Sequence, residues 1–276
     1  MTVHADIVRP TAGSAAGVTY LRRVGGVAAA PLVLLHGIGS NAKSFASLMA
    51  ALPPTVDAVA WNAPGYDAST RLADLSPTPT HYANALLRLL DTLKLDRVSL
   101  VGHSLGCLFV ARFAAQHPDR VAAVALMSPA LGYRVAPGAE LPENVQSRID
   151  EIIALGPQAF ADKRAARLVH QPTRKPGVLA AVRDAMAAAN PAGYTQAVRA
   201  LGAGDLLADA ARIAAPALVA VGADDLITPP ANARAAHAAF VAADYREIAD
   251  AGHALPQEQP EIVADLISRL VERRNV

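Results

Sequence analysis

A serine held between two glycines is the residue best placed for chemistry. Ser104 is the centre of the pentapeptide Gly102–Gly106, the only G-x-S-x-G in the chain. The apolar run Val98–Val101 precedes it and a helix-like segment follows it. A strained turn between a strand and a helix lifts a serine hydroxyl above the sheet edge, where it can attack a carbonyl carbon. We therefore predict Ser104 as the nucleophile of an acyl-transfer reaction.

Such a nucleophile needs a base, and a carboxylate that holds the base in one tautomer. His253 follows the strand-like run Tyr245–Ile248 and a glycine, directly before the last helix-like segment. This position predicts that it lies on the same sheet edge as Ser104 and acts as the base. His103 is the rival, but alternation along a strand should turn its side chain away from the site. The histidines that fall on predicted helices, and are expected at the surface, are His81, His117 and His237.

Two adjacent aspartates follow the strand-like run Ala217–Gly222. They lie between the serine and the histidine, in the chain order serine, acid, histidine that this kind of site uses. We predict Asp225 as the acid that orients the base. Asp224 is expected to cap the turn or to face solvent, and Asp250 is the third candidate.

Backbone N–H groups can stabilise an oxyanion because they are fixed before charge develops. The segment His36–Gly39 follows the apolar run Leu32–Leu35 and precedes a helix-like segment. We expect the N–H groups of Ile38 and Leu105 to form an oxyanion hole. His36 is expected to bond the loop backbone instead of taking part in the reaction.

Composition excludes several other classes of protein. The 276 residues are 53% hydrophobic and carry a formal net charge of +1, with no run of Lys or Arg that would follow a phosphate backbone. Cys107 is the only cysteine, so no internal disulfide or structural zinc site is expected, and it is predicted to pack as a small apolar residue. No apolar stretch is long enough for a signal peptide or a membrane span. We expect a cytoplasmic protein with no nucleic-acid or membrane partner.

Short apolar runs alternate with helix-length segments, which predicts a buried, mostly parallel sheet of about eight strands with helices on both faces. The predicted strands are Leu32–His36, Ala58–Trp61, Val98–Gly102, Val121–Met127, Ala217–Gly222 and Tyr245–Ile248, with Val3–Ile7 and Val18–Val24 as an antiparallel edge. The predicted helices are Asn41–Leu52, Tyr82–Leu93, Leu105–Gln116, Ala231–Val241 and Glu261–Arg274.

The alternation stops between residues 133 and 213, where no strand is predicted. Four helices are expected there, namely Asn144–Leu155, Gln158–Val169, Val178–Ala189 and Ala192–Leu201. An all-helical insertion of this size favours a lid over the carboxyl ends of the strands, where open α/β sheets bind their ligands. We therefore predict a core domain of residues 1–132 and 214–276, and a helical lid of residues 133–213.

In their order and spacing, the motifs resemble those of the α/β-hydrolase superfamily over essentially the whole chain. The segments that carry the resemblance are Leu35–Gly39, Ala63–Tyr66, Gly102–Gly106, Gly222–Asp225 and Ala251–Ala254. The lid is most similar to that of 3-oxoadipate enol-lactonases and related carboxylesterases, through Arg148–Asp150, Leu155–Gly156, Asn190–Tyr194 and Thr228–Pro230. The chain departs from the usual pattern of these enzymes at three core residues, Asn62, Asp67 and Cys107.

The resemblance implies a serine hydrolase that cleaves a small ester or lactone, with no metal or organic cofactor. The same three residues could also serve carbon–carbon bond hydrolysis or perhydrolysis, or remain in a low-turnover ligand receptor. Basic lid residues could form an electropositive mouth for a carboxylate or be ordinary solvated faces. These residues are Lys163, Arg164, Arg167, His170, Arg174, Lys175 and Arg183.

Overall fold

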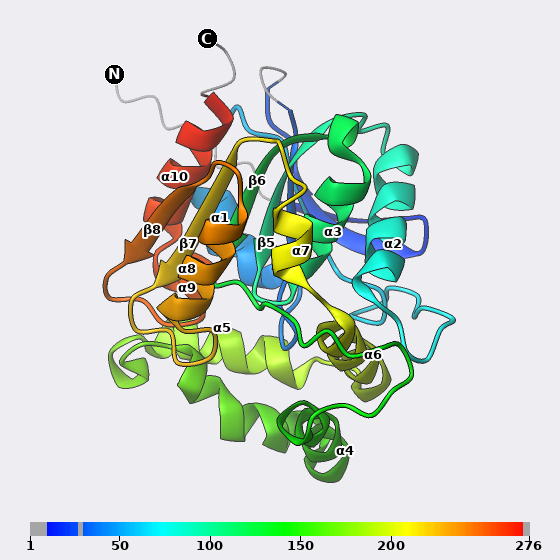
Figure 1. Cartoon of the computed structure of the whole chain (residues 1–276). Helices are drawn as coiled ribbons and strands as arrows, with labels where there is room; N and C mark the ends of the chain where they lie inside the picture. The colour runs from blue at the N-terminus through cyan, green and yellow to red at the C-terminus, as the bar shows by residue number, and fades with distance from the viewer. Residues whose placement is uncertain (1–9, 27–29, 273–276) are drawn as a thin grey trace.

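A mostly parallel eight-stranded sheet organises the chain (Figure 1). The computed structural model describes residues 10–26 and 30–272. The strand order is β1-β2-β4-β3-β5-β6-β7-β8; β2 pairs antiparallel with β1 and β4, and the remaining pairs are parallel. The strands are β1 Thr11–Ala15, β2 Val18–Arg23, β3 Leu32–Leu35, β4 Ala58–Trp61, β5 Val98–His103, β6 Val121–Met127, β7 Ala217–Gly222 and β8 Asp244–Ile248. The predicted fold class is confirmed.

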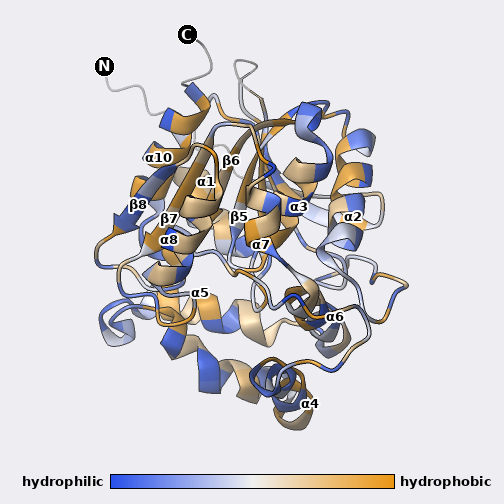
Figure 2. Cartoon of the chain, in the orientation of Figure 1, coloured by the Kyte–Doolittle hydropathy of each residue, from blue (hydrophilic) through white to orange (hydrophobic). Residues whose placement is uncertain are grey.

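The sheet is covered on both faces, which is why its central strands are nearly continuous apolar runs. Every residue of β3 to β7 is buried, and Figure 2 shows β6 and β7 coloured mostly as hydrophobic. Alternate residues of β3 join different cores: Leu34 packs in the core that includes α1 and α10, and Val33 in the core that includes α2 and α3. Successive side chains of a strand point to opposite faces of the sheet, so one buried strand contributes to both cores.

The helices fill the connections between strands and the lid. The α-helices are α1 Ala46–Ala51, α2 Pro79–Thr92, α3 Gly106–Gln116, α4 Glu143–Arg164, α5 Pro176–Ala187, α6 Pro191–Ala203, α7 Leu206–Ala210, α8 Pro230–Ala239, α9 Leu255–Glu258 and α10 Pro260–Glu272. Short 3-10 turns are η1 Ala42–Phe45, η2 Pro118–Arg120, η3 Ala165–Leu168 and η4 Pro172–Arg174. No helix in the described part of the chain is long and apolar enough to cross a membrane.

The antiparallel edge differs from its prediction. Val3–Ile7 lies outside the described residues, and β1 takes the place predicted for it beside β2. The two strands are joined by Ala16 and Gly17, both with positive φ (51° and 76°). A two-residue turn of this kind matches the right-handed twist of a hairpin. The mostly exposed β1 carries no apolar pattern, so periodicity could not reveal it.

Helices α4, α5 and α6, with η3 and η4, lie together at one end of the sheet (Figure 1) and are called the lid below. They share an apolar cluster of their own, which includes Ile152, Met186 and Val198. The first two predicted helices form one element, α4, broken at Gly156 (φ 73°, ψ 161°) just before Pro157. The second of them ends at Arg164 and continues as the 3-10 turn η3.

Candidate active site

The turn that carries Ser104 is strained and tightly packed. Ser104 has φ 54° between β5 and α3, and its N–H donates to the Met127 carbonyl at 2.9 Å. A Cβ on Gly102 would lie 2.7 Å from the backbone of Cys107, and one on Gly106 would lie 2.1 Å from the Leu35 carbonyl oxygen. Only glycine fits on either side of the serine, which explains the spacing of the motif.

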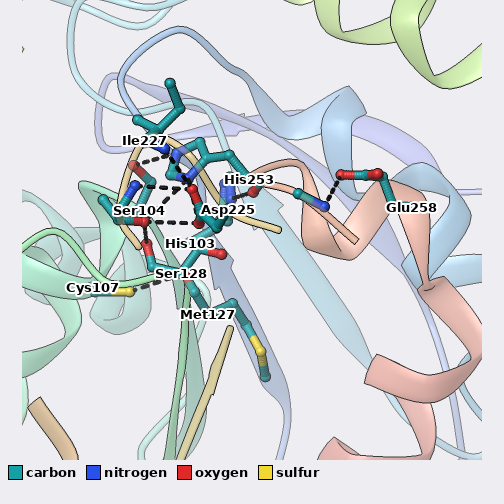
Figure 3. A network of polar contacts seen from close by, with 11 residues as sticks. His103, Ser104, Cys107, Met127, Ser128, Asp225, Ile227, His253 and Glu258 are labelled. Atoms are coloured by element: carbon teal, nitrogen blue, oxygen red, sulfur yellow. Dashed lines mark hydrogen bonds and ion pairs between the residues drawn. The ribbon is translucent and has the colours of Figure 1, made fainter. Parts of the chain in front are cut away.

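Ser104, His253 and Asp225 form one hydrogen-bonded chain (Figure 3). His253 Nε2 lies 3.0 Å from Ser104 Oγ, and His253 Nδ1 lies 2.9 Å from Asp225 Oδ2. The Asp225 carboxylate also accepts the N–H groups of Ile227 and Thr228 at 2.8 and 2.9 Å, and the Thr228 hydroxyl at 3.0 Å. All three members of the chain are buried.

The charge on Asp225 determines which ring nitrogen of His253 carries the proton. Burial alone would raise the pKa of Asp225, but the attraction and hydrogen bond of His253, with the N–H groups of Thr228 and Ile227, lower it to about 2. An ionised carboxylate can only accept hydrogen bonds, so His253 Nδ1 carries a proton that it donates to Asp225. With His253 neutral, Nε2 is left to accept the Ser104 hydroxyl proton.

The loop after β3 lies beside the serine. Ile38 and Leu105 line the same cavity as Ser104, and neither of their N–H groups donates a hydrogen bond within residues 10–26 and 30–272. The Tyr66 hydroxyl donates to the Ile38 carbonyl at 2.5 Å. His36 accepts the Ala63 N–H at Nε2 and bonds the loop carbonyl of the next residue at Nδ1, as the sequence predicted for a loop-bonding residue.

His103 does not turn away from the site, so that prediction was wrong. Its Nε2 donates to the backbone carbonyl of His253 at 2.7 Å, and the two rings lie 5.0 Å apart. Alternation assumed a regular strand on both sides of this residue, whereas the positive φ of Ser104 ends the strand there. Burial, followed by the nearby His253, lowers the pKa of His103 to about 3, so it is a neutral donor.

The rival carboxylates and the thiol lie outside the chain of hydrogen bonds. The side chains of Asp224 and Asp250 are 46% and 64% exposed, and both lie near His170. Cys107 is fully buried, its Sγ donates to the Gly102 and Met127 carbonyls, and burial raises the pKa of the thiol. It packs as an apolar residue.

A cavity of about 320 Å³ opens between the lid and the core. Of the seven basic lid residues singled out from the sequence, Arg164 and Arg167 line it. The sequence did not reveal the roles of three residues. Arg148 also lines the cavity, and the Thr228 hydroxyl donates to Asp225. The Glu258 carboxylate accepts the N–H of Gly252, the residue before His253. Thr228 follows Asp225 by three residues, the one spacing signal available. The described residues hold no group of three or more metal-ligating side chains.

Comparison with known proteins agrees with this architecture. A family model described as "alpha/beta hydrolase fold" matches residues 30–260, so the chain belongs to that family. It is 26% identical over 269 residues to a Caulobacter vibrioides protein that bears the name "Putative carbamate hydrolase RutD", covering 96% of this chain and 98% of the other.

Two solved structures are similar over nearly the whole chain. The enol-lactonase from Burkholderia xenovorans LB400 is 29% identical with a TM-score of 0.83, covering 95% of this chain and 100% of the other. A thermophilic esterase from Thermogutta terrifontis is 23% identical with a TM-score of 0.82, covering 96% and 98%. The second likeness concerns the fold alone.

Proposed function

We propose that this hydrolase cleaves a small ester or lactone by acyl transfer, with Ser104 as nucleophile, His253 as base and Asp225 as the acid that orients it. The observation that carries the proposal is the continuous chain from Ser104 Oγ to the buried Asp225 carboxylate. The similarity to an enol-lactonase supports the choice of carbonyl substrate.

In the first half of the reaction, His253 Nε2 takes the hydroxyl proton as Ser104 Oγ attacks the carbonyl carbon. The carbonyl π electrons move onto oxygen, and the N–H groups of Ile38 and Leu105 stabilise that oxyanion. Collapse of the tetrahedral intermediate re-forms the carbonyl and breaks the bond to the alcohol oxygen. His253 gives its proton to this oxygen, so an alcohol leaves, or the lactone ring opens on the enzyme.

In the second half, water replaces the alcohol. His253 takes a proton from water as its oxygen attacks the acyl carbon, and the same oxyanion forms again. Collapse breaks the bond to Ser104 Oγ, which recovers the proton from His253. The ionised Asp225 stabilises the positive charge that His253 carries in both halves.

The test is steady-state hydrolysis of short para-nitrophenyl esters by the wild type, Ser104→Ala and Cys107→Ala. We expect Ser104→Ala to lower kcat by several orders of magnitude with an unchanged melting temperature. Cys107→Ala is the matched control one helical turn away, and it is expected to keep most of the activity. A fluorophosphonate should add to the wild type at a single peptide that contains Ser104.

Turnover that survives in Ser104→Ala would refute the proposed nucleophile. A well-folded wild type that neither hydrolyses esters and lactones nor reacts with the fluorophosphonate would refute the proposed ester and lactone hydrolysis, and a carbon–carbon bond hydrolase or a ligand receptor would then be the better interpretation.

A further inference from the structure

The cavity that contains Ser104 is cationic on its lid side. Three arginines line it, namely Arg148, Arg164 and Arg167, and no aspartate or glutamate of the described chain does. Its remaining lid residues are apolar or aromatic, with Phe160 and Met186 among them. A low-dielectric cavity with guanidinium groups and no carboxylates concentrates anions.

Arg148 is a half-buried cavity arginine without a carboxylate partner among the described residues, whereas Arg167, which has none either, is exposed to solvent. Its Nε atom is buried and makes no hydrogen bond within the described chain, and its guanidinium takes part in none of the ion pairs found there. Its close polar neighbour is the buried phenol of Tyr194, which is neutral. A guanidinium held partly out of water without a counter-charge costs free energy, which a bound anion would recover.

Arg164 is held in place by its own partners. It shares the Glu151 carboxylate with Lys163, and its guanidinium lies over the Phe160 ring at 5.0 Å. The Phe160 ring in turn packs edge-on against Tyr194 at 5.3 Å. This contact chain builds the wall beside Arg148, whose guanidinium has the neutral phenol of Tyr194, and no carboxylate of the described chain, as its hydrogen-bond partner.

We propose that Arg148 binds a carboxylate of the substrate, so that the site takes anionic esters or lactones whose scissile carbonyl lies at Ser104. The inference rests on the proposed function and narrows its substrate class. A carboxylate matches one guanidinium fork through two parallel hydrogen bonds. The apolar side chains that line the same cavity suit a short hydrocarbon spacer between the carboxylate and the carbonyl.

The test compares two esters of equal length. The anionic ester is the mono-para-nitrophenyl ester of adipic acid, and the neutral one is para-nitrophenyl hexanoate. We expect the wild type to have a higher kcat/KM for the anionic ester, and this preference to shrink as salt is added. Arg148→Gln should reduce the ratio of the two kcat/KM values about tenfold to a hundredfold, mainly through KM.

Two further variants separate charge from geometry. Arg148→Lys keeps the charge without the fork and should give an intermediate ratio. Arg183→Gln is the matched control, because Arg183 is a lid arginine that pairs with Asp162 and does not line the cavity. Its ratio should equal that of the wild type. Melting curves check that each variant folds; if neither Arg148 variant does, the wild-type ratio and its salt dependence decide.

The outcomes separate this inference from the function it rests on. A wild type that hydrolyses the neutral ester as well as the anionic one overturns the inference and leaves the hydrolase standing. If neither ester is turned over, adipate is titrated into Ser104→Ala by calorimetry. Binding that Arg148→Gln abolishes upholds the anion site without the proposed function, and absence of binding overturns it.

Discussion

At the residue scale, the Asp225 carboxylate is distinguished from its neighbour by burial and by donors. Asp225 is 2% exposed and accepts hydrogen bonds from two backbone N–H groups, the Thr228 hydroxyl and His253. Asp224, one residue earlier, has a side chain that is 46% exposed. The fold thus gives two identical side chains different environments, and one of them can hold a charge against His253.

Replacing each aspartate by asparagine tests this difference. Asp225→Asn keeps the size but presents an amide that can hold the imidazole in the wrong tautomer, so kcat should fall about a thousandfold or more. Asp224→Asn should change kcat by less than about threefold, because its side chain contacts neither Ser104 nor His253. Steady-state kinetics on one ester measures both. The reverse order of effects would assign the orienting role to Asp224.

Two buried histidines should make the fold sensitive to acid. Burial lowers the pKa of His36 to about 4 and that of His103 to about 3, from 6.5 in the unfolded chain. Below pH 6.5 the unfolded chain therefore takes up protons that the folded chain does not, and stability falls as the pH drops toward 4. The free energy of unfolding measured with urea should fall by about 1.4 kcal/mol for each histidine as the pH drops by one unit in this range.

A single substitution isolates one of these contributions. His103→Gln should make the loss of stability between pH 6 and pH 4 shallower by about 1.4 kcal/mol per pH unit. His81→Gln is the control, because the side chain of His81 is 40% exposed and lies on α2, away from the site. An unchanged slope in His103→Gln would mean that this histidine takes up its proton in the folded state.

At the element scale, the sequence predicted the central strands well and the lid less well. Strands β3 to β7 are buried on both faces, so the run of apolar residues alone located them. Helices α7 and α9 have five and four residues, too few for a helical period to be seen. Which lid side chains face the cavity was not predictable, because the break at Gly156 reorients half of α4.

The break in α4 also explains a contact that no straight helix could make. Glu151 pairs with Arg164, thirteen residues later along the same element. In a continuous helix these residues would be about 20 Å apart along the axis. The non-helical backbone of Gly156, with its positive φ, folds the two halves of α4 toward each other, and both Arg148 and Arg164 line the cavity.

The buried carboxylate of Glu258 joins the lid to the loop that carries His253. The side chain of Glu258 is fully buried; it accepts the N–H groups of Gly252 at 2.8 Å and His170 at 2.9 Å, and pairs with Lys175 at 3.1 Å. The N–H of Ala254 donates to the lid carbonyl of Leu168 at 2.9 Å. The position of His253 is therefore tied to that of the lid.

We predict that Glu258→Gln lowers kcat/KM for a short ester about tenfold and destabilises the fold by about 3 kcal/mol, because Lys175 and the two N–H groups lose their shared charge. Lys175→Met should lower kcat/KM in the same direction. Glu247→Gln, which removes an exposed ion pair with Arg234, is the control and should change neither quantity. A loss of stability with unchanged kcat would show that Glu258 only holds the fold together.

At the scale of the whole molecule, strand order assembles the site. Ser104 and His253 are 149 residues apart, and Asp225 and His253 are 28 apart. Their loops follow β5, β7 and β8, whose carboxyl ends meet at one edge because these strands are parallel in one sheet. The motifs and their order in the sequence predicted that these three loops lie at the same edge of the sheet. The lid contacts depend on packing between distant segments, which a single sequence does not specify.

The lid is fastened to the core at a second place, where two glycines meet. A Cβ on Gly193 of α6 would lie 2.0 Å from the Gly65 carbonyl oxygen, and Gln196, one turn later, donates to the carbonyls of Leu72 and Asp74. With the Glu258 contacts, the lid is attached to the core at two places, so we expect it to behave as a fixed wall of the site.

Gly193→Ala tests how much the molecule depends on that contact. The added methyl group must push α6 away from the loop at Gly65, so we expect a loss of about 1–3 kcal/mol in urea unfolding and faster proteolytic cleavage within the lid. Gly177→Ala is the matched control in the first turn of α5, where nothing lies within 4 Å of the new Cβ. It should be neutral or stabilise by up to about 1 kcal/mol, since it removes only backbone freedom from the unfolded chain. Equal stability and equal cleavage rates in the two variants would mean that the lid tolerates displacement from the core at α6.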